Sequence, residues 1–378
     1  MLILQAICFV LLLCYIVLMS LYKLGWKLQA DFRLPQNFQP KTVVSVIIPA
    51  RNEEQNISAC IESILKQEYP CHLFEIIVVD DHSTDSTTAV VKSFNDERVK
   101  CISLAAADLG HTVAYKKKAI EAGIGAATGE LIVTTDADCI APKLWLKNIA
   151  AIYEQTKAAM IVAPVDFTSN ASLVQLFQSL DFMSMQGITG AAHKLKLGNM
   201  SNGANLAFNK QAYIDVDGYK GIDHLASGDD FLLMHKMQAQ FPGRIAYLKA
   251  GNAIVRTAPQ PDWSGFLQQR IRWASKSGKY DDKKMTAILI LVYLFNVSLL
   301  VLFIAGLFDQ SSMLVAGWVL LAKIIVELLF LVPVARFFGK LKQLAVFPFF
   351  QPLHIVYIVL AGLLGFVGVY KWKGRTVK

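Results

Sequence analysis

The feature that most constrains the fold is an N-terminal stretch, residues 2–22, that contains no charged side chain. A run of about 20 apolar residues is long enough to cross the hydrocarbon core of a bilayer as a helix. A cleaved signal peptide is the alternative, but the run lacks both a basic region before it and a clear small-residue cleavage site. We therefore expect a transmembrane anchor over residues 1–24.

Three more apolar stretches follow near the C-terminus, over residues 286–308, 313–334 and 344–370. Each is long enough to span a bilayer. Pro348 and Pro352 interrupt the start of the last stretch, which could instead be an interfacial or re-entrant segment. The sequence predicts a C-terminal membrane domain of two to three spans over residues 285–378.

Basic side chains flank the central segment, residues 41–280, on both sides. They are Lys23, Lys27, Arg33 and Lys41 before it, and Lys279, Lys283 and Lys284 at its end. The positive-inside rule therefore places this segment in the cytoplasm, with a bacterial inner membrane as the expected location. The basic tail, residues 371–378, conflicts with four complete spans, so the sequence leaves open whether the last stretch crosses.

The net charge of +8 is largely explained by these flanking residues, which would contact anionic membrane lipids. We expect no nucleic-acid partner, because no stripe of basic and aromatic residues is present. The six cysteines lack the close pairs of a zinc or redox site, which indicates reduced packing residues.

The central segment alternates short apolar runs with helical periodicity. Residues 43–48, 74–79 and 130–135 are expected strands, and residues 53–66 and 116–127 are expected helices. Strands that are apolar throughout predict a mostly parallel sheet between helices. The sequence does not fit a nicotinamide-type dinucleotide-binding domain, because that fold needs a glycine-rich turn after its first strand and this turn has no glycine.

Polar clusters follow three of the predicted strands, at residues 49–53, 80–85 and 136–138. Ligands of such sheets bind outside the carboxyl ends of the strands, where these clusters should converge. Asp136 and Asp138 would be costly there unless they were paired or held a cation. Carboxylates suit a divalent metal that also carries diphosphate oxygens, although acidic pairs at strand ends are more often turn or cap residues.

Six motifs, in order, resemble the family 2 glycosyltransferases with the GT-A nucleotide-sugar-binding fold. They are P-x-x-N-E at residues 49–53, D-D-x-S-x-D at 80–85, G-E…D-A-D-C at 129–139, G-x-x-x-A-F at 203–208, an acidic pair at 229–230, and Q-x-x-R-W at 269–273. The resemblance implies an α/β GT-A domain with transmembrane helices at both ends. It also implies a hexosyl- or N-acetylhexosaminyl-type transferase.

The resemblance assigns roles to particular residues. Donor binding falls to Pro49, Ala50, Asn52, Glu53, Asp80, Asp81, Lys116 and Asp136. Asp138, supported by Asp136, would hold Mg²⁺ or Mn²⁺. Asp230 would be the general base, assisted by Asp229, Gln269, Arg272 and Trp273.

Each role has a structural alternative. The acidic pairs at residues 80–81 and 229–230 could cap helices, and Glu53 could be a first-turn carboxylate. The lysines at residues 116–118 could form a solvated helix face. The helix carrying Q-x-x-R-W could lie on the membrane surface as a basic amphipathic helix that includes Arg270.

The expected function is inverting, metal-dependent transfer of a sugar, most commonly from a UDP-linked donor in this family, to a lipid-linked or glycan acceptor at the membrane. A processive polysaccharide synthase is the nearest alternative, and a non-catalytic nucleotide-sugar sensor is a remote one. A transporter is excluded because the polar motifs lie outside the apolar runs. The sugar, the acceptor and the oligomeric state stay open.

Overall fold

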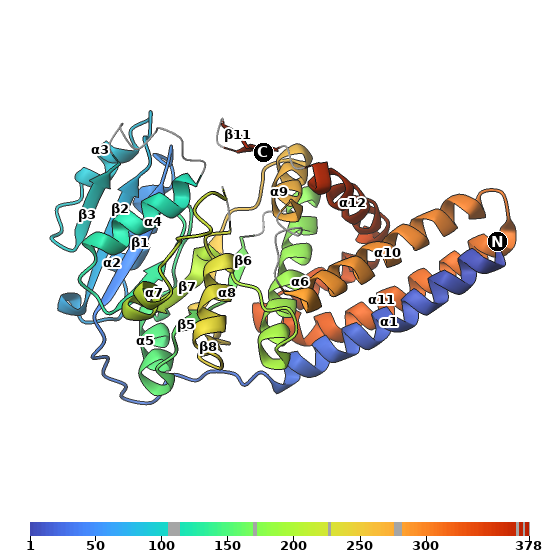
Figure 1. Ribbon diagram of the computed structural model, residues 1–378, viewed down its shortest axis with the longest axis horizontal. Helices are drawn as coiled ribbons and strands as arrows, with labels where there is room; N and C mark the ends of the chain where they lie inside the picture. The colour runs from blue at the N-terminus through green and yellow to red at the C-terminus, as the bar shows by residue number, and fades with distance from the viewer. Residues whose placement is uncertain are drawn as a thin grey trace. The chain divides into compact units, whose positions relative to one another are not determined.

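The computed structural model describes residues 1–104, 114–168, 172–225, 228–275, 282–367, 370–372 and 375–377. The chain divides into two compact units (Figure 1). The first, here the α/β unit, comprises Ala30–Thr168 and Met200–Ala258. The second, here the helical unit, comprises Met1–Gln29, Ser169–Asn199 and Pro259–Lys378.

A seven-stranded sheet forms the centre of the α/β unit, in the order β3-β2-β1-β4-β7-β5-β8. Its strands are β1 (Val44–Ala50), β2 (Phe74–Asp80), β3 (Val99–Ser103), β4 (Leu131–Thr134), β5 (Met160–Val162), β7 (Leu206–Asn209) and β8 (Ile245–Tyr247). All neighbours pair in parallel except β7, which is antiparallel to β4 and β5. The predicted mostly parallel sheet between helices is confirmed.

The strands at the centre of the sheet are buried at nearly every position. Every residue of β2 and β4 is buried, and only Pro49 of β1 is partly accessible. Such strands are covered on both faces, which is why they are apolar and β-branched throughout rather than alternating. A separate two-stranded sheet pairs β6 (Val165–Phe167) with β9 (Val255–Thr257).

Strand order places a topological switch beside β1. From β1 the chain moves outward to β2 and β3, and then returns to β4 on the other side of β1. The loops after β1 and β4 therefore diverge, and a crevice at such a point is where open α/β sheets bind ligands.

The helices of the α/β unit are α2 (Ile57–Leu65), α3 (Thr87–Lys92), α4 (Tyr115–Ala126), α5 (Trp145–Thr156), α7 (Lys210–Asp215) and α8 (Phe231–Gln240). The 3-10 turns η1 (Cys71–Leu73), η3 (Gly203–Asn205) and η4 (Gly251–Ala253) also lie in this unit. α2 buries Ile57, Cys60, Ile61 and Ile64, the face that the sequence predicted, but it begins four residues later than expected. The preceding residues are instead bonded to the loop after β2, as described below.

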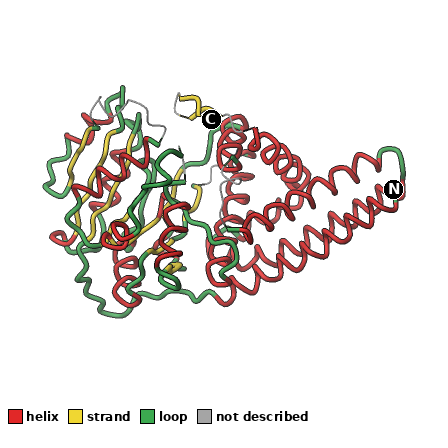
Figure 2. Tube along the Cα trace, viewed as in Figure 1, coloured by secondary structure: helices red, strands yellow, loops and turns green. Residues whose placement is uncertain are grey.

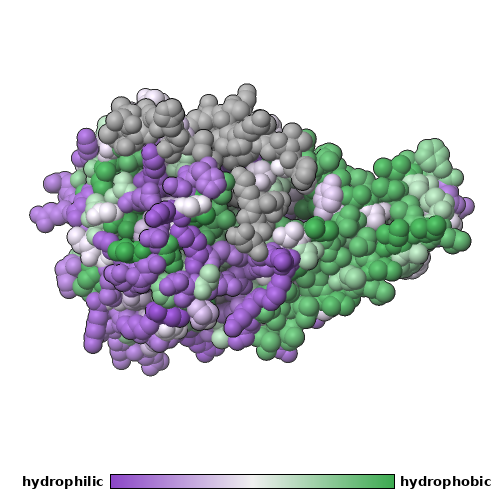
Figure 3. Space-filling view, in the orientation of Figure 1, coloured by the Kyte–Doolittle hydropathy of each residue, from purple (hydrophilic) through white to green (hydrophobic). Residues whose placement is uncertain are grey.

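The helical unit contains the long apolar helices together with α6 and α9 (Figures 1 and 2). Its elements are α1 (Leu2–Leu28), α6 (Leu173–Leu195), α9 (Trp263–Ala274), α10 (Lys283–Gly306), α11 (Gln310–Phe338), η6 (Leu341–Val346), α12 (Phe347–Val367), β10 (Tyr370–Trp372) and β11 (Arg375–Val377). α1 packs against α6, α10 and α11. Apolar side chains cover α1, α10 and α11, whereas the surface over the α/β unit is largely hydrophilic (Figure 3).

Within the described residues, four helices have the length and hydropathy needed to cross a membrane: Leu2–Leu28, Lys283–Gly306, Gln310–Phe338 and Leu341–Gly365. The last begins with the 3-10 turn η6 and contains Pro352 inside α12, which fits the irregular start expected from its prolines. The compact units are not continuous in sequence, because α6 and α9 lie within residues 41–280 yet group with the apolar helices. The division into membrane and cytoplasmic parts at 1–24, 41–280 and 285–378 stays a prediction.

Candidate active site

The loops after β1 and β2 are bonded into one surface. Asn52 and His82 both adopt positive φ angles, 52° and 56°, which turns each loop sharply after its strand. The Thr84 N–H donates to Asn52 Oδ1 at 2.8 Å, and Asn52 N–H donates to Ser83 Oγ at 3.0 Å. Arg51 Nη1 donates to the Asp81 carbonyl at 2.7 Å. These hydrogen bonds fix the conformation of each loop relative to the other.

Asp80 and Asp81 lie buried at the carboxyl end of β2. Asp80 Oδ1 accepts the Ser83 N–H at 3.2 Å, and Asp81 Oδ1 lies 3.0 Å from His82 Nδ1. The N-cap of α3 is Ser86, so the helix-cap interpretation is wrong for both aspartates. Their carboxylates shape the loop, and their role in donor binding stays a prediction.

Pro49 and Ala50 are the last two residues of β1, and Glu53 follows in the turn. The Glu53 N–H donates to Thr87 Oγ1 at 2.8 Å, and Glu53 Oε2 accepts from Asn56 Nδ2 at 2.9 Å. Because α2 begins at Ile57, Glu53 precedes its first turn. Its carbonyl nevertheless accepts the Ile57 N–H at 2.9 Å, so Glu53 lies at the N-terminal start of this helix, and its role as a helix-start carboxylate stays a prediction.

The acidic motif follows β4 directly. Asp136 and Asp138 are partly accessible to solvent, and Cys139, the next residue, is buried. One ligand atom from each of these three side chains lies within 4.8 Å of the others. Burial, together with the charges of both aspartates, raises the pKa of the Cys139 thiol, which donates to Asp138 Oδ1 at 3.6 Å. A thiol with a raised pKa is a poor metal ligand, so the two carboxylates are the donors that fit Mg²⁺ or Mn²⁺.

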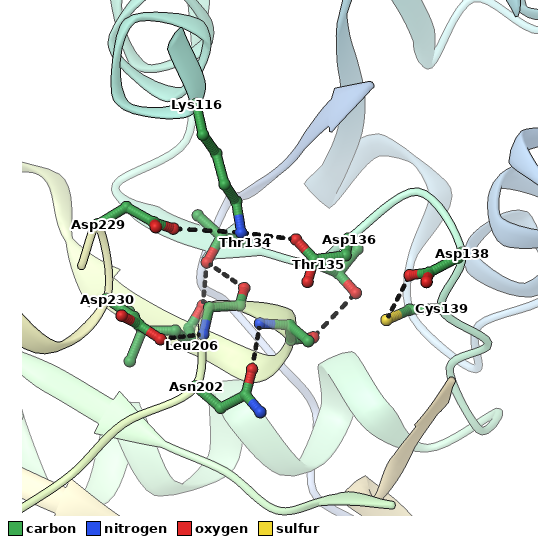
Figure 4. Close-up of polar contacts among 12 residues, drawn as sticks. Lys116, Thr134, Thr135, Asp136, Asp138, Cys139, Asn202, Leu206, Asp229 and Asp230 are labelled. Atoms are coloured by element: carbon green, nitrogen blue, oxygen red, sulfur yellow. Dashed lines mark hydrogen bonds and ion pairs between the residues drawn. The ribbon is translucent and has the colours of Figure 1, made fainter. Parts of the chain in front are cut away.

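Lys116 connects this motif to the second acidic pair (Figure 4). Its ammonium lies 2.7 Å from Asp136 Oδ1 and 3.2 Å from Asp229 Oδ2. Burial alone would lower the pKa of Lys116, but the charges of Asp136 and Asp229 outweigh it and raise that pKa above its ordinary value. The first turn of α4 is thus tied to the loop after β4 and to the start of α8.

Lys117, the next residue of α4, is also buried, with 1% of its surface exposed. Its ammonium donates to the carbonyls of Ile222 and Leu225 at 2.6 and 2.8 Å. These carbonyls lie in the loop that precedes Asp229. The interpretation of the lysine run as a solvated helix face is therefore wrong for Lys116 and Lys117.

Asp230 is the N-cap of α8, as the helix-cap alternative expects, but it has a second contact. Its Oδ1 accepts the Phe231 N–H at 2.7 Å, and its Oδ2 accepts the Gly203 N–H at 3.0 Å. A Cβ at Gly203 would lie 3.0 Å from Asp229 Oδ2 and 3.3 Å from Lys116 Nζ. Glycine at this position therefore allows the lysine and both aspartates to converge.

The turn that carries Gly203 is held by the end of β4. Thr134 Oγ1 donates to the Gly203 carbonyl at 3.0 Å, and Thr135 Oγ1 donates to the Ala204 carbonyl at 2.9 Å (Figure 4). Sequence analysis missed these two threonines. Two hydroxyls at the end of an otherwise apolar strand were the available signal.

Gln269, Arg272 and Trp273 lie on α9, in the helical unit. Their part in the site formed by Lys116 and the aspartates stays a prediction. Arg270, between them, is buried with 4% of its surface exposed, so the surface-helix interpretation is wrong for this residue. Lys116 joins two predicted site residues, Asp136 and Asp229, and Asp138 and Asp230 adjoin them.

Two family models match the chain. The model described as glycosyl transferase family 2 matches residues 45–214, and that described as glycosyl transferase family group 2 matches residues 131–367. Together they cover nearly all of the sheet, the acidic residues at 80–81, 136–138 and 229–230, and the C-terminal apolar helices. The second match spans more than half of the chain.

Two curated relatives illustrate the similarity. Glycosyltransferase AglE of Haloferax volcanii is 26% identical over 189 residues, which are 50% of this chain and 58% of that protein. The Escherichia coli UDP-Glc:alpha-D-GlcNAc-diphosphoundecaprenol beta-1,3-glucosyltransferase WfgD is 37% identical over 109 residues, 28% of this chain and 37% of that protein. The aligned region thus spans less than two thirds of either relative.

One solved structure supports the fold over nearly the whole chain. The mannosyltransferase PcManGT from Pyrobaculum calidifontis, in complex with GDP-Man and Mn²⁺, superposes with a TM-score of 0.59 at 18% identity. The match covers 96% of this chain and 97% of that one. At this identity the likeness establishes a shared fold.

Proposed function

This chain belongs to glycosyltransferase family 2, and on that premise we propose that it is a membrane-bound inverting glycosyltransferase. It moves a sugar from a nucleotide-diphospho-sugar to a lipid-linked or membrane-proximal acceptor. The observation that carries the proposal is the bridge that Lys116 makes between Asp136 and Asp229, with Asp138 and Asp230 adjoining. One cation among four carboxylates leaves a site that attracts a divalent metal ion.

Asp138 and Asp136 are the residues that would hold Mg²⁺ or Mn²⁺. The ion, when bound, stabilises the negative charge that develops on the departing diphosphate. Lys116 stays protonated beside the same carboxylates and supplies a second positive charge to the leaving group. The complex of the Pyrobaculum structure with Mn²⁺ supports the choice of metal.

Asp230 is the proposed general base. The acceptor hydroxyl must lose its proton as it attacks the anomeric carbon, and a carboxylate within hydrogen-bond reach can take that proton. The two backbone N–H groups that bond to Asp230 fix its orientation, because each of its oxygens accepts one of them. Because Asp230 is assigned as the base and no carboxylate is assigned as a nucleophile, the proposed reaction is direct displacement with inversion.

Donor recognition is proposed to involve the surface formed by the loops after β1 and β2. Asp81, and with it Asp80, would accept hydrogen bonds from the base or ribose, while Asn52 and Glu53 line the same loops beyond Pro49–Ala50. The named relatives use different nucleotides, UDP-Glc in one and GDP-Man in the structural neighbour. A UDP-linked donor is our first choice.

A lipid-linked acceptor is supported by the apolar helices and by the Escherichia coli relative, whose name specifies a diphosphoundecaprenol acceptor. We place the α/β unit on the cytoplasmic side of a bacterial inner membrane, because basic residues flank residues 41–280 at both ends. The donor and the membrane lipid would then be available on the same side.

The proposal is tested by incubating native membranes that contain the protein with radiolabelled nucleotide-sugars and Mn²⁺ or Mg²⁺, followed by lipid extraction. Label should enter the lipid fraction with one donor class and should be absent with the Asp138→Ala and Asp230→Asn variants. Label that enters lipid equally with both variants would refute the assignment.

A processive polysaccharide synthase of the same family is the second candidate. The Q-x-x-R-W motif at residues 269–273 favours it, because the motif is frequent in such enzymes. Sizing gels separate the two functions, since a synthase yields long polymers and a single-addition transferase yields one discrete product. A non-catalytic nucleotide-sugar sensor would bind donor in the same assay without consuming it.

A further inference from the structure

A buried ion pair joins α6 to α9 inside the helical unit. Arg270 Nε and Nη2 lie 2.9 and 2.7 Å from Asp181 Oδ2, and the two side chains are 4% and 5% exposed. The cost of removing both charges from water offsets most of the attraction between them, so such a pair adds little net stability. The pair is therefore better explained by what it holds in place.

Arg270 contacts two of the three Q-x-x-R-W side chains. Its Nη1 donates to Gln269 Oε1 at 3.2 Å, and its guanidinium carbon lies 4.3 Å from the centroid of the Trp273 ring. The ring of Trp273 also packs against Phe182, with centroids 6.1 Å apart. The guanidinium thus restrains both the amide of Gln269 and the indole of Trp273.

Two side chains of α12 also contact the Asp181 carboxylate. The Tyr357 hydroxyl donates to Asp181 Oδ1 at 2.6 Å, and His354 Nε2 lies 3.8 Å from the same oxygen. The other carboxylate oxygen is the one that accepts Arg270. Asp181 therefore cannot rotate without losing contacts to two helices, and Arg270 is anchored through it.

We propose that Arg270, anchored by Asp181, is a positioning residue that sets Gln269 and Trp273 for the acceptor. This inference rests on the proposed function, and it takes Trp273, which the family resemblance assigns to the catalytic set, to stack on an acceptor sugar or lipid headgroup. Arginine suits the role because its planar guanidinium places two nitrogens beside one Asp181 oxygen, Nε as a hydrogen-bond donor and Nη2 as an ion-pair contact, while its face stacks on an aromatic ring. Lysine, with a single ammonium, cannot do both.

The test uses the full-length protein in detergent micelles, with the donor identified in the membrane assay and a lipid extract of native membranes as acceptor. Arg270→Gln and Asp181→Asn should each lower kcat/KM for acceptor by about 100-fold, the cost of a misplacement near 1 Å. Affinity for the Mn²⁺–nucleotide diphosphate complex, measured by calorimetry, should stay unchanged. The double variant should lose no more than either single variant, because both act through one pair.

A matched control is the Lys323–Glu327 pair on α11, whose side chains are 0% and 7% exposed and 2.7 Å apart. The double variant Lys323→Met/Glu327→Gln removes another buried ion pair of the same unit, and it should keep the wild-type kcat/KM for acceptor. Trp273 emission, obtained by subtracting spectra of Trp273→Phe partners, should shift in Arg270→Gln and not in the control.

If Arg270→Gln does not fold, Arg270→Lys carries the test and should lower kcat/KM for acceptor while donor affinity is kept. The proposal is overturned if Arg270→Lys or Asp181→Asn retains wild-type kcat/KM, or if the control loses as much. A wild-type protein that transfers no sugar from any donor would instead refute the proposed function, before any Arg270 variant is compared.

Discussion

Lys116 and Asp136 form an ion pair of 2.7 Å between the first turn of α4 and the loop after β4. The same ammonium reaches Asp229, so one lysine spans both acidic motifs. Because its positive charge lies beside both carboxylates, Lys116 offsets the repulsion between Asp136 and Asp229. Asp136 is also proposed to bind the sugar donor and the metal ion.

Replacing Lys116 by methionine should weaken affinity for the nucleotide diphosphate and lower kcat by about 100-fold, the typical effect of removing one group that stabilises a developing charge. Since its pKa is raised, the defect should be constant from about pH 6 to 10. Steady-state kinetics across pH checks this. Lys118→Met, two residues along α4, is the control, and an equal defect there would contradict the assignment.

Asp230→Asn should lower kcat by about 10²- to 10⁴-fold, as expected for loss of a general base. Asparagine is as good an N-cap as aspartate, so α8 should be preserved, although its single amide oxygen cannot also accept the Gly203 N–H. Calorimetry should then show unaltered nucleotide binding. Turnover close to wild type in Asp230→Asn would show that the carboxylate serves only to cap the helix.

Removing divalent ions with a chelator should abolish transfer, and added Mn²⁺ or Mg²⁺ should restore it. Asp138→Ala should stay inactive at metal concentrations that saturate the wild type, because it loses one of two carboxylate ligands. Activity assays with metal titration measure both effects. Full activity in the presence of excess chelator would exclude a metal-dependent mechanism.

Lys117→Met should lower kcat and leave donor affinity unchanged. The lysine holds the carbonyls of Ile222 and Leu225, and removing it leaves two acceptors in the loop before Asp229 without this partner. The loop should then position Asp229–Asp230 less accurately. A split between kcat and nucleotide affinity checks the prediction, and loss of both in parallel would indicate general unfolding instead.

Glu75 gives the α/β unit a pH-dependent stability. Burial by itself would raise the pKa of Glu75, but hydrogen bonds from Lys100, Ser45 and Thr128 outweigh it and lower that pKa from 4.5 to about 2. A depressed pKa adds stability above the unfolded-state value, and this contribution is lost as pH falls toward about 2.

Thermal unfolding of the wild type and Glu75→Gln should therefore differ most above about pH 5 and converge in more acidic buffer. Glu62→Gln is the control, because the Glu62–Lys66 pair is exposed and adds little stability. A gap between the wild type and Glu75→Gln that stays constant from neutral pH to about pH 2 would contradict this origin.

The sequence by itself determined the long apolar helices and the three strands that precede the polar clusters. Short, continuous β-branched runs such as residues 43–48 predict strands covered on both faces, and charge-free runs such as residues 2–22 are long enough for membrane helices. Strand ends in a parallel sheet share one edge, so the contact between the loops after β1 and β2 was also predictable. These features depend on local period and length.

Tertiary structure alone decided which of the lysines and arginines are buried and what each one holds. Lys116, Lys117 and Arg270 resemble surface charges in sequence, since burial of a cation depends on acceptors far along the chain, such as Asp229, Leu225 and Asp181. Likewise, no local pattern shows that a side chain at Gly203 would obstruct the site. The periodicity of apolar residues predicts which face of a helix or strand is buried, but it does not predict which distant residue packs against that face.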